Sequence, residues 1–160
     1  MDILNSEFLL FLQCAQKNNL AYLLIGGYAV NYYGYTRNTD DMDIWLKPTN
    51  ENRDIFVNTL LCMGYQKQEV DALYQEDFSK HFVGSVGAED SQIDFITIVH
   101  WNISFDEAES KKEDYIIENG PTVHIVPYEL LKEMKLRSSR EKDLFDIARL
   151  EELRNSPPKK

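Results

Sequence analysis

The chain has 160 residues, with 17 Lys and Arg against 27 Asp and Glu, and a formal net charge of −10. The length suits one domain, and a hydrophobic fraction of 43% is enough for a packed core, which excludes disordered, collagen-like and low-complexity classes. The deficit of positive charge argues against a protein that wraps long nucleic acid or binds an anionic membrane surface, because both contacts depend on Lys and Arg.

The N-terminal segment has no basic stretch followed by a signal-length apolar stretch, and no segment approaches the ~18 apolar residues that span a bilayer. The two cysteines, Cys14 and Cys62, each lie in an apolar stretch that predicts a helix. Without CxxC spacing or a neighbouring histidine, buried thiols are favoured over a metal site or a disulfide. We therefore predict a cytoplasmic protein with reduced cysteines.

Apolar periodicity and helix-stopping or strand-stopping residues divide the first part of the chain into alternating helices and strands. In order we expect a helix from Asn5-Ser6 to about residue 18, a strand at 21–25, a short helix at 28–33, a strand at 42–47 and a helix at 50–62. Gly26-Gly27 follows the first of these strands.

The middle of the chain is richer in predicted strands, which we place at residues 64–67, 72–75, 80–86 and 92–99. Asn119-Gly120-Pro121 predicts a hairpin turn between strands at 115–118 and 123–126. Pro127 then opens a helix to about Arg137, and Ser139 caps a last helix to about Leu153. The pattern predicts one α+β domain over residues 1–154, with a mixed sheet between helices and a flexible tail at 155–160.

Two carboxylates mark the start of the strand at 42–47. Asp41 and Asp43 are two positions apart, so they point to the same face of the strand, ~7 Å apart. Such a pair is a good ligand for a hard divalent cation, and without a cation the two charges repel and raise each other's pKa. On its own, such a pair favours a solvated acidic turn.

A third carboxylate, Asp94, lies within the apolar stretch Gln92-Ile93-Asp94-Phe95-Ile96. A carboxylate inside a strand is costly unless it is paired, hydrogen-bonded or metal-bound. An edge strand that exposes Asp94 to solvent, or an arginine partner, are the alternatives. A metal site shared with the carboxylate pair explains both acidic strands at once.

Gly26-Gly27 lies between a predicted strand and a predicted helix. This position exposes backbone N–H groups where a phosphate can approach closely, although most glycine pairs are simply turns. Here the glycine pair is followed in chain order by the carboxylate pair and then by the single carboxylate. That order favours the functional interpretation.

These features together resemble the nucleotidyltransferase superfamily that shares the DNA polymerase β catalytic fold. The first part is LLIGGYAVNYYGYTRNTDDMDIWL, residues 23–46, and the third carboxylate falls in QIDFIT. The GG-x-A-V…G…R-x-T-x-D-x-D string is similar to small bacterial nucleotidyltransferases, which include antibiotic-modifying enzymes and toxin–antitoxin proteins. LLKEMKLRSSREKDLFDIARL, residues 130–150, resembles their closing C-terminal helices.

The resemblance implies a polymerase β-like fold and a function for each matching residue. Gly26 and Gly27 would contact the triphosphate of a nucleoside triphosphate (NTP). Asp41 and Asp43 would bind Mg²⁺, of which two ions are expected, and Asp94 would complete one metal site and position or deprotonate the acceptor hydroxyl. The acceptor would be a small molecule or a protein, and pyrophosphate would be released.

Some basic residues are further candidates for phosphate contacts, and ion pairs within the protein are the alternative. Arg37 is a candidate phosphate contact, or else an ion pair with Asp40. Lys142 is a candidate polyphosphate contact, while pairing with carboxylates of the same helices is the alternative and is favoured for Arg137. Many relatives carry Ser where this chain has Tyr28, so either phosphate binding would depend on backbone amides alone or nucleotide affinity would be low. His100-Trp101 is a further candidate for the wall of an acceptor pocket.

The sequence thus predicts an Mg²⁺-dependent nucleotidyltransferase. The alternative is a weakly active or inactive domain that binds a nucleotide or a partner protein, for example within a toxin–antitoxin system.

Overall fold

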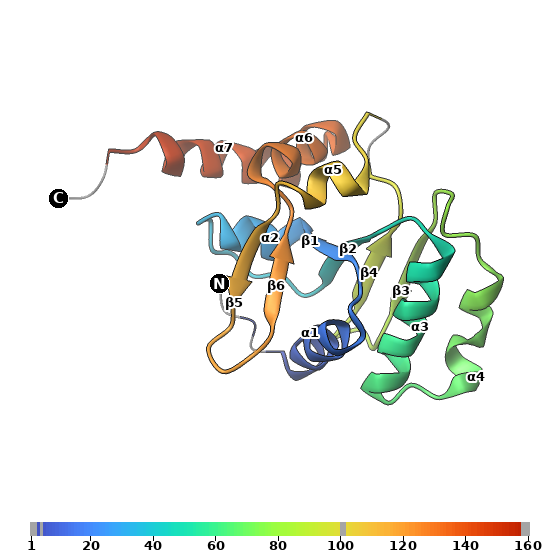
Figure 1. The fold of residues 1–160 in the computed structure, drawn as a ribbon. Coiled ribbons are helices and arrows are strands. Elements are labelled where there is room, and N and C mark those ends of the chain that lie inside the picture. Colours follow the sequence, from blue (N-terminus) through green and yellow to red (C-terminus); the bar gives the residue numbers. More distant parts are fainter. Residues whose placement is uncertain (1–2, 4, 100–101, 158–160) are drawn as a thin grey trace.

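The computed structural model describes residues 3, 5–99 and 102–157, and its centre is a six-stranded mixed sheet in the order β3-β4-β2-β1-β6-β5 (Figure 1). The strands are β1 Tyr22–Ile25, β2 Met42–Leu46, β3 Val83–Val86, β4 Ile93–Ile96, β5 Glu113–Ile116 and β6 Thr122–Ile125. Strand β1 is antiparallel to β2 and parallel to β6, and β2 is parallel to β4. Strands β3 and β5 pair antiparallel with their neighbours at the two edges.

Helices flank this sheet, so the predicted α+β class is confirmed. They are α1 Ser6–Asn18, α2 Gly26–Tyr32, α3 Asn50–Met63, α4 Lys67–Val70, α5 Phe105–Glu109, α6 Tyr128–Ser138 and α7 Glu141–Asn155. Helix α1 packs against α3, and α6 packs against α7 and α2. In Figure 1, α6 and α7 lie together at the top of the view, and α1 and α3 lie below them.

The core lies around the two central strands. All four residues of β1 are buried, and Met42 and Ile44 of β2 are fully buried, because helices cover both faces of the sheet there. Phe11 and Leu12 of α1 pack into the same core. The Trp45 side chain is also buried, and its indole Nε1 donates a hydrogen bond to the Thr97 carbonyl at 2.9 Å.

Side-chain caps explain where the first large helices begin. The Asn5 side chain accepts hydrogen bonds from the backbone N–H groups of Glu7 and Phe8 at the start of α1. Thr49 caps α3 in the same way, and Gly64, with φ of 105°, ends that helix in the left-handed conformation. These caps place α1 and α3 close to their predicted positions.

The strands predicted at 64–67 and 72–75 are wrong. Residues 67–70 form helix α4, and Asp71–Gln75 form a 3₁₀ turn. The Glu69 carboxylate accepts a hydrogen bond from the Gln66 backbone N–H at 2.6 Å, which closes a helical turn at this point. Only Val70 is buried in α4 and the 3₁₀ turn, so no strand-like buried face exists.

Three helix boundaries also differ from the prediction. Helix α2 begins at Gly26, two residues before the predicted start, and α5 was not predicted although Ser104 caps it. Ser139 does not cap the last helix, because its φ of 54° ends α6, and Arg140 precedes α7 instead. His100-Trp101 and residues 158–160 of the predicted tail lie outside the described residues, while Asn155 still belongs to α7.

The prediction of free thiols is wrong, since Cys14 of α1 and Cys62 of α3 form a disulfide with a Cα–Cα distance of 5.8 Å. The two helices pack side by side, and this contact between segments 48 residues apart is invisible in local spacing. Within the described part of the chain, no helix combines the length and apolarity needed to cross a membrane.

Candidate functional site

The predicted carboxylates meet at one end of strands β2 and β4. Asp43 and Asp94 are direct cross-strand partners, and such partners lie on the same face of a sheet ~4.8 Å apart. Asp41 lies in the bend directly before β2. All three side chains line one cavity of about 220 Å³, so the structure brings together the three residues that the sequence singled out.

The charges of these carboxylates are poorly compensated. Burial, and then the charges of Asp94 and Asp41, raise the pKa of Asp43 to about 6, although Lys135 and Arg140 oppose the shift. Burial and the neighbouring Asp94 and Asp40 charges also raise the pKa of Asp41. Neither the Asp41 nor the Asp43 side chain accepts a hydrogen bond from any described residue. The pair therefore combines closely spaced negative charges with raised pKa values, which a bound cation would lower.

Asp94 differs from the other two carboxylates in its hydrogen bonds. Its Oδ1 accepts from the Ser85 hydroxyl at 2.5 Å and from the Gln92 side-chain amide at 2.7 Å. Both donors converge on the same oxygen, and no described residue donates to Oδ2. The orientation of Asp94 is therefore fixed through one oxygen, and the other remains open for a ligand.

The glycine pair is required by close packing around the cavity. Gly26 has φ of 65°, and a Cβ there would lie 2.0 Å from Oδ2 of Asp43. A Cβ on Gly27 would lie 2.4 Å from the Thr39 hydroxyl. Both glycines line the cavity at the start of α2. A side chain at position 26 would therefore displace a carboxylate of the site.

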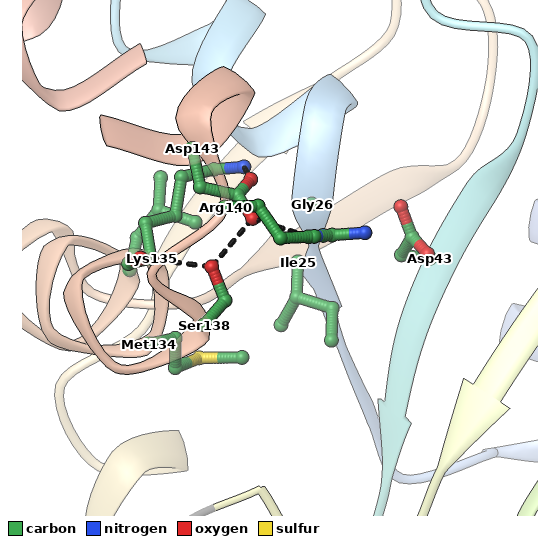
Figure 2. Close-up of a pocket in the computed structure, with 9 residues that line it drawn as sticks. Ile25, Gly26, Asp43, Met134, Lys135, Ser138, Arg140 and Asp143 are labelled. Atoms are coloured by element: carbon green, nitrogen blue, oxygen red, sulfur yellow. Dashed lines mark hydrogen bonds and ion pairs between the residues drawn. The ribbon is translucent and has the colours of Figure 1, made fainter. Parts of the chain in front are cut away.

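The opposite wall of the cavity is basic, with Lys135 from α6, Arg140 from the α6–α7 connection and Lys142 from α7. Asp143 accepts hydrogen bonds from Lys135 at 2.7 Å, the Ser138 hydroxyl at 2.5 Å and Arg140 Nε at 2.7 Å. Burial acts to raise the pKa of Asp143, but these donors outweigh it and lower the pKa to about 2. Figure 2 shows Arg140 extending from Asp143 toward Asp43.

A second buried carboxylate, Asp146, joins this network to the loop before β2. Arg37 binds it in a bidentate manner, with Nε and Nη2 at 2.8 and 2.9 Å, and Lys135 contacts it at 3.0 Å. The sequence predicted, as one alternative, an ion pair between Arg37 and Asp40. This alternative is wrong, because Arg37 pairs with Asp146 instead. Arg37 still borders the cavity, so its contact with a phosphate stays a prediction.

Two other predicted basic residues behave differently from each other. Lys142 lines the cavity, its charge opposes the pKa rise of Asp41, and it makes no ion pair among the described residues. Arg137 pairs with Glu133 at 3.2 Å on the outside of α6, as the sequence favoured. Tyr28 is buried edge-to-face against Phe8, with ring centroids 5.7 Å apart, which makes it a core residue.

Beside the charged cavity lies a smaller, more apolar hollow of about 150 Å³ (Figure 2). Ile25, Leu131 and Met134 form its apolar part, while Asp43 and Arg140 border both hollows. A ligand that reaches from one to the other would therefore place a charged group at the carboxylates and an uncharged group against α6.

Comparison with protein-family models gives no match, and comparison with curated protein sequences gives none. The function is therefore inferred from the residues around the cavity and their chemistry.

The donor set fits a hard divalent cation in its chemistry. Asp41 and Asp43 offer carboxylate oxygens without hydrogen-bond donors, and Asp94 offers a free Oδ2. The side-chain conformations are not those of a formed site: across residues 3, 5–99 and 102–157, no three His, Cys, Asp or Glu side chains are grouped so that they could hold a metal ion. A cation would thus have to draw the carboxylates together.

Proposed function

We propose that the protein is an Mg²⁺-dependent nucleotidyltransferase with a polymerase β-like fold. It moves a nucleoside monophosphate from an NTP to a hydroxyl of a small molecule or a protein and releases pyrophosphate. The observation that carries the proposal is the convergence of Asp41, Asp43 and Asp94, a glycine pair and four cationic side chains on one cavity. Metal-dependent phosphoryl transfer needs both carboxylates that bind the metal and cations that bind the phosphates.

In this proposal Asp41, Asp43 and Asp94 hold Mg²⁺, with two ions expected. When bound, the ions stabilise the negative charge on the attacking and leaving oxygens of an in-line displacement. The raised pKa values of Asp41 and Asp43 support this assignment, because a nearby cation favours the ionised carboxylate. The Asp94 carboxylate also orients the acceptor hydroxyl and takes its proton.

The basic wall binds the polyphosphate of the NTP. Among the described residues, Asp143 holds Arg140 through Nε alone, and no other contact occupies the terminal amino groups of the guanidinium, which can bind an anion. Lys142 adds a cation that forms no ion pair with a described carboxylate. Lys135 is held by Asp143 and Asp146, so it contributes its charge from a fixed position. Net negative charge disfavours long nucleic acid but does not oppose a nucleotide bound with its metal.

The test is an assay of pyrophosphate release with each NTP, Mg²⁺ and a panel of hydroxyl acceptors. We expect metal-dependent release that Asp43→Asn reduces to background, while Asp71→Asn, which changes an exposed carboxylate outside the cavity, leaves it unchanged. Failure of every NTP to bind in the presence of Mg²⁺ would contradict the proposal.

A second function is favoured by one observation, the lack of a formed three-carboxylate metal site among the described residues. In this reading the domain binds a nucleotide or a partner protein without turnover. Calorimetric titration separates the two: NTP binding with Mg²⁺ but without pyrophosphate release supports the binding domain. Release that depends on Asp94 as well as Asp43 supports the enzyme.

The cytoplasm is the compartment we propose, as the sequence predicted, because it contains NTP and Mg²⁺. The Cys14–Cys62 disulfide opposes this placement, since disulfides persist mainly in oxidising compartments. Alkylation of thiols at the moment of cell lysis, followed by mass analysis, decides the question. Two alkylated cysteines would support the cytoplasm, and an intact disulfide would contradict it.

A further inference from the structure

Three polar side chains form a row across strands β3, β4 and β2. Ser85 is the cross-strand partner of Asp94, and Asp94 is the cross-strand partner of Asp43. Partners on neighbouring strands point to the same face at ~4.8 Å intervals, so a hydroxyl, a third carboxylate and a proposed metal ligand lie in line. Strand β3 is an edge strand, and Ser85 is exposed on it.

The Ser85 hydroxyl already contacts the carboxylate that the proposed reaction assigns to the acceptor hydroxyl. Its Oγ donates to Asp94 Oδ1 at 2.5 Å, and the Gln92 amide approaches the same Oγ at 3.4 Å. In the proposed reaction, Asp94 orients the acceptor hydroxyl and removes its proton. The chain therefore presents its own hydroxyl to its own proposed general base.

We propose that Ser85 is an acceptor of the reaction and that the protein nucleotidylates itself there. This inference rests on the proposed function. A bond forms between Ser85 Oγ and the α-phosphorus of the NTP, and the bond from that phosphorus to the bridging oxygen of the β-phosphate breaks. The hydroxyl proton passes to Asp94, pyrophosphate leaves, and Ser85 carries a phosphodiester-linked nucleoside monophosphate.

A purely structural role for Ser85 makes a different prediction. If Ser85 serves only to orient Asp94, then its hydroxyl never becomes covalently modified, whatever the activity toward other acceptors. The presence of a nucleotide on the protein therefore separates the two roles. The chain also offers a matched hydroxyl, because exposed Ser79 donates to Asp77 Oδ1 at the same 2.5 Å, and Asp77, unlike Asp94, does not line the cavity.

The experiment incubates the full chain with Mg²⁺ and each of the four NTPs, without an added acceptor, and measures intact mass and the modified peptide by tandem mass spectrometry. We expect one nucleoside monophosphate per chain, located on Ser85. Ser85→Ala and Asp94→Asn should remove the added mass, whereas Ser85→Thr should retain it at a slower rate. Ser79→Ala should be modified like the wild type.

The outcomes distinguish this inference from the function on which it rests. Pyrophosphate release with an external acceptor, but no nucleotide on the protein, overturns the role of Ser85 and leaves the proposed function standing. Modification located on another residue, or retained in Ser85→Ala, overturns it as well. If no NTP is consumed under any condition, both the inference and the proposed function fail.

Discussion

The two walls of the cavity treat buried charge in opposite ways. On the sheet, Asp41 and Asp43 lack hydrogen-bond donors among the described residues and have raised pKa values. On the C-terminal helices, Asp143 receives three donors, its pKa is lowered to about 2, and Asp146 is paired with two cations. The carboxylates of the basic wall are paired within the chain, whereas Asp41 and Asp43 form no ion pair with any described residue.

This difference separates stability from function. Paired buried charges fix the position of α6 and α7 against the loop before β2. Unpaired carboxylates destabilise the folded chain until a ligand binds them, which is typical of functional sites. Substitutions in the two walls should therefore have opposite effects on the free energy of unfolding.

The largest effect is expected from Asp146→Ala. The change removes a buried carboxylate, 1% exposed, and leaves Arg37 without its bidentate partner. Breaking a buried pair in this way costs about 3–5 kcal/mol of the free energy of unfolding, measured by urea denaturation. Glu152→Ala, which breaks an exposed pair with Arg149, is the control and should cost less than ~1 kcal/mol. Similar losses for both variants would contradict the contrast.

Asp43→Asn should act in the opposite direction in metal-free protein. The pKa of Asp43 is about 6 when folded against an ordinary value of 3.8, so the folded state binds the proton more tightly. This tighter proton binding stabilises the folded state fully below pH 3.8, and the stabilisation is lost as the pH rises through 6. The asparagine side chain of the variant cannot ionise, so the variant keeps this stabilisation as the pH rises. It should be more stable than the wild type by about 3 kcal/mol at pH 7.

The measurement is urea denaturation of wild type and Asp43→Asn between pH 3 and pH 8 in the presence of a chelator. The difference between the two proteins should vanish at low pH and grow through the range from 4 to 6. A variant that is less stable than wild type at pH 7 would show that Asp43 is already neutralised within the chain.

Mg²⁺ should reverse part of this difference. A ligand that binds only the folded state stabilises it by about 1.4 kcal/mol at ten times its dissociation constant. Wild type should therefore gain thermal stability on addition of Mg²⁺ with NTP, and a chelator should remove the gain. Asp43→Asn should gain much less. An equal gain in both proteins would place the cation elsewhere.

The smallest effect is expected from Arg137→Ala. Arg137 lies on the same helix as Lys135 but faces solvent, where it pairs with Glu133 four residues earlier. Exposed pairs of this kind contribute ~0.5 kcal/mol or less, so urea denaturation should detect almost no change. A loss above ~1 kcal/mol would extend the structural network beyond the buried residues.

Local patterns in the sequence were sufficient for the acidic wall. Strands β1, β2 and β4 have strong apolar runs, and Asp41, Asp43 and Asp94 interrupt or precede these runs in a conspicuous way. The α+β class followed from the same runs. The segment at 64–75 misled because Tyr65, Leu73 and Tyr74 suggest strand-forming residues, whereas a turn of helix and a 3₁₀ turn satisfy the backbone there.

The basic wall and the disulfide depend on contacts that local patterns do not contain. Arg37 and Asp146 are 109 residues apart, and the sequence instead suggested the nearby Asp40 as a partner. The spacing of Asp143 and Asp146, three residues apart on one buried face of α7, was the available signal for their structural role. Cys14 and Cys62 became partners only through the packing of α1 on α3.

The Cys14–Cys62 bond also divides the site along the covalent chain. It closes a ring that contains Gly26, Gly27, Asp41 and Asp43, while Asp94 and the basic helices lie outside it. For a sequence separation of 48 residues, ring closure lowers the entropy of the unfolded chain by an equivalent of about 4 kcal/mol. In the oxidised chain, the glycine pair and the carboxylate pair remain confined to one ring even after the sheet has come apart.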